Sequence, residues 1–260
     1  MTFPDNFDRL AVGEAQIRDL SRNAIIASEA LSLHARMIER AMTMLDYVAK
    51  HHPHRDDDEL VLQILATRLF NSSASALGLT MRGYYQAAVA LMRDVLETTF
   101  LVDYLWEFPE HIAAWRTATE AERLKKFGAV TIRKALDDRD GYTERKREAH
   151  YKLLCELGTH PTFRGFGLLM AKPSNLVNVG PFFSVDSLDA VLEELAKIMV
   201  LAGSHMRLIE ERSLDDYRLL LDYLRTQAEW CEVNFRKPMD LDQIVMIEEM
   251  VAYLEQHGAS

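Results

Sequence analysis

The chain has 260 residues, of which 48% are hydrophobic and 27% are charged. This balance allows a sizeable globular core and argues against disorder on a large scale. The formal net charge of −10 repels phosphate backbones, so general nucleic-acid binding is disfavoured. Two cysteines cannot build a disulfide framework, the N-terminus lacks the apolar segment of a signal peptide, and no apolar run approaches the roughly 20 residues of a membrane span. We therefore expect a cytoplasmic protein that does not enter a membrane.

Apolar residues recur at helical spacing along almost the whole chain. After an N-terminal segment of residues 1–21, this spacing predicts helices over 22–51 and about 56–79. The next helix, 84–106, is apolar nearly all round, which is typical of a central, buried helix. Its only charged residues are Arg93, Asp94, Glu97 and Asp103.

Further helices are expected on both sides of an irregular stretch. The same spacing predicts them at 109–115, 120–136 and 143–157 before the stretch, and at 187–212, 214–233 and 241–254 after it. We therefore predict an all-α fold, a multi-helix bundle of about eight to nine helices. Residues 1–260 are expected to form one helical domain, with a bundle core at 22–212 and a C-terminal helical pair at 213–260.

The irregular stretch covers about 158–185 and holds a cluster of glycines and prolines, which interrupt helices. A connector of this length is usually functional or has structure of its own. Two short apolar runs, Gly165–Met170 and Val177–Phe183, can pair as a short β-hairpin; otherwise the stretch forms an irregular loop. We expect it to fold over the central helix near Arg93 and Glu97.

Three polar residues are candidates for a ligand-binding site. Arg93 and Glu97 are four residues apart on the central helix, so they share a face and can pair. A charge inside a core must be paired or used, so this pair is either the floor of a polar pocket or a structural ion pair. His160 lies between a helix-ending Gly158 and Pro161, where it is either an acid–base group or a loop anchor.

The same residues carry a resemblance to a known family. The segments RGYYQAAVALMRDVLE at 82–97, YKLLCELGTHP at 151–161 and GPF at 180–182 are together similar to those of a bacterial helical family known only as a domain of unknown function. The resemblance implies an all-α bundle with a polar cluster built from Arg93, Glu97 and His160. It implies no particular activity.

A more distant similarity concerns the HEPN domains, helical bundles that include RNA-cleaving toxins. Their nucleases carry Arg-x(4–6)-His, and here the spacing is matched by Arg145 and His150, although Lys146 stands where the family usually has a polar residue such as Asn. The resemblance implies a ribonuclease of a toxin or phage-defence system that acts as a dimer. The basic residues in and around this segment otherwise indicate a solvated helix face: Lys125, Lys126, Arg133, Lys134, Arg145, Lys146 and Arg147.

Several kinds of chemistry have no motif in this chain. No His-Glu-x-x-His or Glu-x-x-His pattern, no G-x-G-x-x-G, no phosphate-binding P-loop and no G-x-S-x-G is present. We therefore expect no metal and no cofactor. The leading hypothesis is a non-enzymatic or regulatory domain that binds a small ligand or a protein partner at a polar pocket, and the ribonuclease is the alternative. The amphipathic helix at 241–254 either closes the bundle or builds a homodimer.

Overall fold

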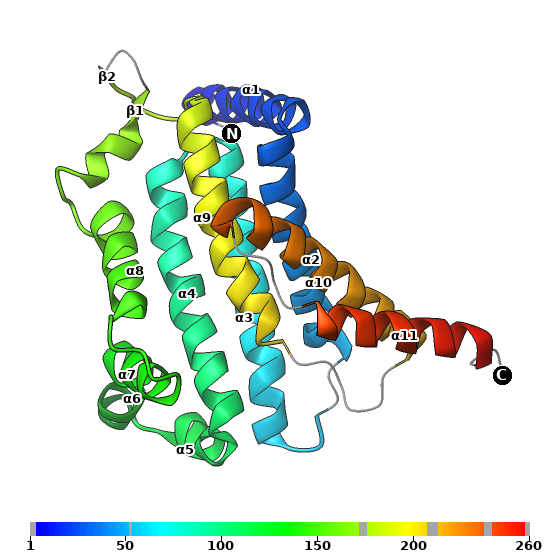
Figure 1. Ribbon diagram of the computed structural model, residues 1–260. Helices are drawn as coiled ribbons and strands as arrows, with labels where there is room; N and C mark the ends of the chain where they lie inside the picture. Colours follow the sequence, from blue (N-terminus) through cyan, green and yellow to red (C-terminus); the bar gives the residue numbers. More distant parts are fainter. Residues whose placement is uncertain (1–3, 52–53, 172–175, 207–212, 237–240, 258–260) are drawn as a thin grey trace.

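The computed structural model describes residues 4–51, 54–171, 176–206, 213–236 and 241–257. Over these residues the protein is a bundle of helices with one two-stranded sheet, which confirms the predicted all-α fold (Figure 1). None of the described helices is both long and apolar enough to cross a membrane.

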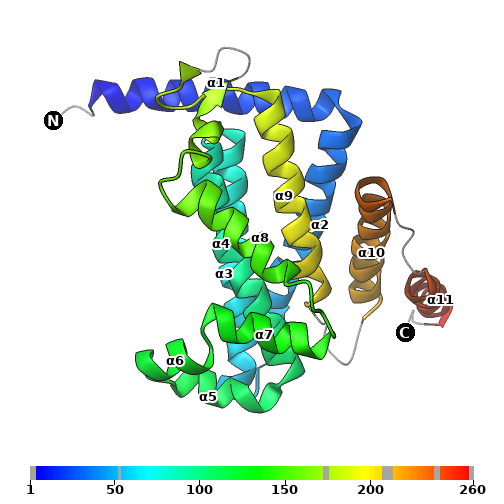
Figure 2. The same ribbon diagram turned by 60° about the vertical axis from the view of Figure 1, so that its left-hand side comes forward.

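Four long helices run side by side through the body of the bundle (Figures 1 and 2). Helix α4 is central, as its apolar sequence predicts: it packs against α3 and α9 and against the segments that follow it, and Met92, Val95 and Leu96 have no exposed surface. Asp56 caps α3 by accepting hydrogen bonds from the backbone N–H groups of Asp58 and Glu59. The four helices are α2 (Glu29–His51), α3 (Asp57–Met81), α4 (Tyr85–Glu107) and α9 (Val185–Ser204).

The prediction of one helix over 22–51 is wrong. Helix α1 (Asp5–Ala27) takes in most of the expected N-terminal segment and lies across one end of the bundle, nearly at right angles to α2 (Figure 1). The chain breaks at Ser28, whose backbone is extended with φ −122° and ψ 123°. The Ser28 hydroxyl then accepts from the Leu31 N–H at 3.3 Å, which gives the first turn of α2 an acceptor.

Short helices cover the C-terminal half of α4 at the opposite end of the bundle. The expected helix 120–136 is divided at Phe127 and Gly128: a Cβ at Gly128 would lie 2.5 Å from the Leu124 carbonyl oxygen, and Phe127 turns into the core. The helices are the 3-10 turn η1 (Pro109–His111), α5 (Ile112–Thr117), α6 (Glu120–Lys126), α7 (Ala129–Arg139) and α8 (Lys146–Leu154).

The irregular stretch contains the predicted hairpin, although the hairpin is smaller than the two apolar runs. Met170 pairs with Val177 and Ala171 with Leu176 in antiparallel register, whereas residues 165–169 form a 3-10 turn. Before the hairpin, a five-residue π-helix presses Gly158 onto α4 so closely that a Cβ there would lie 2.5 Å from the Ala90 nitrogen. The elements are η2 (Cys155–Thr159), η3 (Gly165–Leu169), β1 (Met170–Ala171) and β2 (Leu176–Val177).

The C-terminal helices form a layer on the side of α2. Helix α10 (Leu214–Phe235) packs on α2, and α11 (Asp242–His257) packs on α10 (Figure 1). The indole of Trp230 is fully buried and donates to Nδ1 of His34 at 2.9 Å, which joins α10 to α2.

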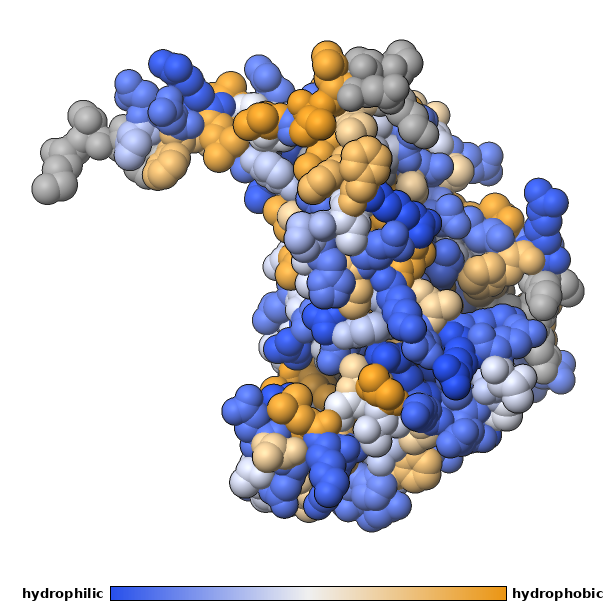
Figure 3. Space-filling view, turned by 90° about the vertical axis from the view of Figure 1, so that its left-hand side faces the viewer, coloured by the Kyte–Doolittle hydropathy of each residue, from blue (hydrophilic) through white to orange (hydrophobic). Residues whose placement is uncertain are grey.

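Two ends of the molecule project toward the same side. Helix α1 extends beyond the bundle at one end and α6 at the other, so the intervening surface is hollowed (Figures 2 and 3). The floor of this hollow is formed by α3 and α4, and the pocket described below lies where it meets α5–α7.

Candidate functional site

The structure brings Arg93 and Glu97 together. One guanidinium nitrogen of Arg93 lies 2.9 Å from a Glu97 carboxylate oxygen, and the guanidinium also donates to the Tyr151 hydroxyl of α8 at 2.5 and 3.0 Å. Burial opposes the charge of Arg93, but the hydrogen bond with Tyr151 and the charge of Glu97 raise its pKa above the ordinary value. Arg93 therefore keeps its charge and ties α4 to α8.

His160 stands apart from this pair. It is exposed at the end of η2, and among the described residues no hydrogen bond or ion pair joins its ring to Arg93 or Glu97. The irregular stretch packs on the N-terminal half of α4, where Gln86 donates to the Gly165 carbonyl oxygen at 3.2 Å. The stretch thus covers the central helix before Arg93, while α8 covers the helix at Arg93 itself.

A second arginine completes what we call the Arg93 cluster: Arg93, Glu97, Tyr151 and Arg133 of α7. Arg133 lies over the Tyr151 ring with its guanidinium carbon 4.1 Å from the ring centroid, and Arg93 lies 5.0 Å from the same centroid. The aromatic face attracts cations electrostatically. Arg133 is only 6% exposed, so the expectation that the basic residues of this segment form a solvated face is wrong for Arg133.

Glu97 also lines a pocket of about 380 Å³ between α3, α4 and the short helices, which we call the Trp115 pocket. Its walls combine aromatic and aliphatic side chains with two arginines and two carboxylates, a composition typical of small-molecule sites. The lining residues are Ile64, Leu65, Arg68, Asp94, Glu97, Thr98, Phe100, Leu101, Trp115, Arg123, Phe127, Ala129 and Ile132.

Most charges of the Trp115 pocket are already paired. Arg68 donates to Asp94 at 2.5 Å and to the Thr98 hydroxyl at 3.3 Å, and Glu97 is held by Arg93. Arg123 is different: across the described parts of the chain its guanidinium has no ion pair or side-chain hydrogen bond. As far as the structure describes the chain, the pocket therefore presents the unpaired cation of Arg123 beside an apolar wall.

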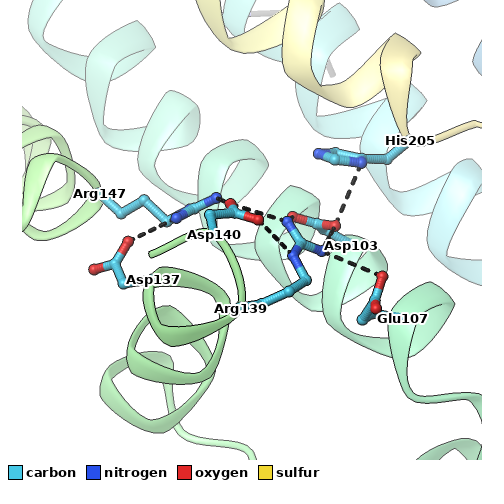
Figure 4. A network of polar contacts seen from close by, with 7 residues as sticks. All are labelled: Asp103, Glu107, Asp137, Arg139, Asp140, Arg147 and His205. Atoms are coloured by element: carbon cyan, nitrogen blue, oxygen red, sulfur yellow. Dashed lines mark hydrogen bonds and ion pairs between the residues drawn. The ribbon is translucent and has the colours of Figure 1, made fainter. Parts of the chain in front are cut away.

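A separate network of ion pairs lies where the C-terminal end of α7 meets α4 and α8 (Figure 4). Arg139 donates to both carboxylate oxygens of Asp103 at 2.6 and 3.1 Å and to Asp140 at 2.7 Å, and Arg147 binds Asp140 and Asp137. The hydrogen bond from Arg139, together with Arg147, lowers the pKa of Asp140 to about 2. Through His205, 3.5 Å from Asp103, the network joins α4, α7 and α8 to the end of α9.

The residues of the ribonuclease alternative face different surroundings. Arg145 precedes α8, is 78% exposed in its side chain and lies 3.8 Å from Glu148. His150 contacts Glu194 of α9. Arg145 and His150 line different surface hollows. Although burial alone would raise it, the contact with His150 and Lys197 lowers the pKa of Glu194 to about 2. The imidazole is thus held by a carboxylate on another helix and is not paired with Arg145.

No family model, no curated protein and no solved structure matches the chain. Among the residues that the structure describes, no group of three or more His, Cys, Asp or Glu side chains could hold a metal ion.

Sequence reasoning found the Arg93–Glu97 pair but missed Tyr151, Arg133 and Arg123 as its neighbours. A tyrosine at 151 was visible within the segment 151–161, yet nothing in the sequence says that α8 lies against α4 at that point. The basic run around Arg133 gave no signal that one member is buried, because burial depends on how α7 docks on α4 and α8.

Proposed function

We propose that this protein is a non-enzymatic binding domain that takes a small molecule with an apolar body and an anionic group in the Trp115 pocket. The observation that carries the proposal is the combination, in one pocket of about 380 Å³, of the Trp115 and Phe127 side chains with the unpaired guanidinium of Arg123. Aromatic walls supply apolar contact, and a few placed polar groups fix orientation.

Binding fits this pocket better than catalysis. No histidine, cysteine or lysine is among the described residues that line it. Asp94 and Glu97 each accept a hydrogen bond from an arginine, so both carboxylates already have a partner within the protein. The arginine-held carboxylates supply negative walls that orient an anionic ligand toward Arg123.

A fluorescent probe with this chemistry tests the proposal. Anilinonaphthalene sulfonate has an aromatic body and a single anionic group, and its emission rises on entering an apolar site. Titration into the full chain is expected to show one saturable site. Arg123→Gln removes a charge-assisted contact and is expected to weaken this site about tenfold, because such contacts contribute about 1.5–3 kcal/mol.

Two further variants make the test specific. Ile64 is 54% exposed at the pocket wall, so Ile64→Trp fills the opening without disturbing the core and is expected to abolish the saturable signal. Lys125→Gln removes an equal charge from the same helix, at an exposed residue outside the pocket lining, and is expected to change nothing. Equal probe binding by wild type, Arg123→Gln and Ile64→Trp would rule the proposal out.

A further inference from the structure

We infer that a second pocket, between α7 and α8, binds a small oxyanion, the phosphate or carboxylate group of a soluble molecule. It has a volume of about 230 Å³ and we call it the Arg133 pocket. It shares no lining residue with the Trp115 pocket, so the inference is independent of the proposed function. The lining residues are Val130, Arg133, Lys134, Asp137, Asp138, Tyr142, Thr143, Arg145 and Glu148.

Arg133 forms the floor of this pocket and lacks an acceptor. It is 6% exposed, whereas every other lining residue is half-buried or exposed. Its Nε and Nη1 atoms are buried without any hydrogen-bond partner within the part of the chain that the structure describes. Such donors are rare in folded proteins, because each one has given up its hydrogen bonds to water.

The charge of Arg133 cannot be removed by losing a proton. A buried lysine can become neutral, but a guanidinium stays protonated in proteins. The stacked Tyr151 ring attracts the cation at 4.1 Å, yet a ring offers no acceptor in the plane of the N–H groups. Glu97, the carboxylate of the Arg93 cluster, is taken by Arg93 at 2.9 Å. Among the described residues, the buried Nε and Nη1 atoms of Arg133 therefore lack a negatively charged acceptor.

The nearby acids do not supply that charge. Asp137 pairs with Arg147 at 2.6 Å and Glu148 with Lys152 at 2.6 Å. The third acid, Asp138, is exposed to solvent. Lys152, with smaller contributions from Arg145 and Arg133, lowers the pKa of Glu148. None of the three acids, however, accepts a hydrogen bond from the buried Nε or Nη1 atom of Arg133.

The rim adds positive charge and hydrogen-bond donors. Lys134 and Arg145 are exposed lining residues, and Tyr142 and Thr143, from the segment that joins α7 and α8, add hydroxyl groups to the lining. The planar guanidinium of an arginine presents parallel N–H groups that match two oxygens of a phosphate or carboxylate. This side of the molecule faces the viewer in Figure 3, where the surface over α7 and α8 is mostly hydrophilic.

Thermal unfolding of the full chain at constant ionic strength tests the inference. Inorganic phosphate or acetate replaces chloride, and an oxyanion at about tenfold its dissociation constant is expected to raise Tm by about 3 °C. Phosphate alone, acetate alone or both can give the shift, and the pattern identifies which oxyanion group the pocket prefers. No shift with either anion overturns the inference.

Substitutions locate the shift. Arg133→Met keeps the length of the side chain and removes its charge; it is expected to abolish the anion shift while leaving Tm in chloride equal to or above the wild-type value. The double variant Lys134→Gln, Arg145→Gln changes only exposed side chains and is expected to weaken phosphate binding even if Arg133→Met does not fold. Arg123→Gln, in the Trp115 pocket, is the control and is expected to keep the full shift. An undiminished shift in both the Arg133→Met protein and the rim double variant would contradict the inference.

Discussion

Helix α7 carries two arginines less than two turns apart that have opposite surroundings. Arg139 contacts the carboxylates of Asp103 and Asp140 and lies 3.8 Å from that of Glu107 (Figure 4). Arg133 contacts an aromatic ring and has buried nitrogens with no acceptor. Both side chains are largely removed from water, so the difference lies in what the fold supplies to them.

This contrast separates a structural charge from one that is open to a ligand. The hydrogen bonds that Arg139 donates to Asp140 and Asp103 raise the pKa of Arg139 above its ordinary value, so the folded state favours its charge. Arg133 has the Tyr151 ring beside it, but within the described residues its Nε and Nη1 atoms donate to no carboxylate. A paired buried charge holds helices in place, whereas an unpaired one is a cost that a bound anion relieves.

The largest expected effect is the loss of the paired arginine. Arg139→Met leaves Asp103, which is 5% exposed, without its guanidinium partner. Removing one member of a buried pair is expected to lower the free energy of unfolding by about 3 kcal/mol, measured by urea denaturation. Arg133→Met, on the same helix, is expected to leave it unchanged or to raise it.

A double variant shows whether the cost comes from the stranded carboxylate. Asp103→Asn in the Arg139→Met background removes the unpaired charge, so it is expected to recover part of the lost stability. If Arg133→Met is as destabilising as Arg139→Met, the distinction between the two arginines fails.

A paired carboxylate elsewhere gives the next largest effect, through pH. Glu194 has a pKa of about 2 in the folded protein, against an ordinary 4.5. Its stabilising contribution is therefore complete above about pH 5 and is lost as the pH falls toward 2, by about 3 kcal/mol in total. Urea denaturation at a series of pH values is expected to show this loss of unfolding free energy. In Glu194→Gln, the loss between about pH 5 and pH 2 is expected to be smaller by about 3 kcal/mol.

His150→Gln serves as the matched variant, because it takes away the partner and leaves the carboxylate. In this variant the loss of unfolding free energy at low pH is expected to be smaller than in the wild type but not absent, since Lys197 still lies 3.0 Å from Glu194. An unchanged acid limb in both variants would show that Glu194 is not the group responsible.

The sequence predicted the parts of the fold that depend on local pattern. The near-absence of charge between 84 and 106 identified the central helix, and spacing alone placed Arg93 beside Glu97. The break at Ser28 was missed because apolar spacing continues through it, and only the packed structure turns the chain there. The hairpin was found because glycine and proline interrupt helices wherever they cluster.

The surroundings of the arginines that form the two pockets and the ion-pair network could not be predicted, because they depend on contacts between helices. The run Asp137–Gly141 lies between the helices expected at 120–136 and 143–157, yet its acids and Arg139 meet Asp103 and Arg147 from other helices. An arginine in a basic run can be exposed to solvent, paired with a carboxylate or buried without an acceptor. Which of these occurs depends on the acidic residues of the helices that pack against it. Arg133, Arg139 and Arg147 illustrate that residue type and spacing alone do not distinguish these outcomes.

The smallest expected effect comes from the rim of the Arg133 pocket. Arg145 has a left-handed backbone with φ 51°, a conformation that side chains disfavour by about 1–2 kcal/mol and that glycine adopts freely. Replacing Arg145 by glycine removes this cost, but glycine also raises the conformational entropy of the unfolded chain, which offsets part of the gain. Arg145→Gly is therefore expected to stabilise the protein by about 0.5 kcal/mol in chloride.

Arg236 provides the control, because it has φ 53° at the end of α10 and lies far from the Arg133 pocket in the chain. Arg236→Gly is expected to give the same gain in chloride and in phosphate, whereas Arg145→Gly is expected to gain less in phosphate than in chloride. Equal gains for Arg145→Gly in both salts, by thermal unfolding, would mean that its side chain takes no part in holding an anion. The left-handed backbone that places Arg145 at the rim of the Arg133 pocket would then have a purely structural origin.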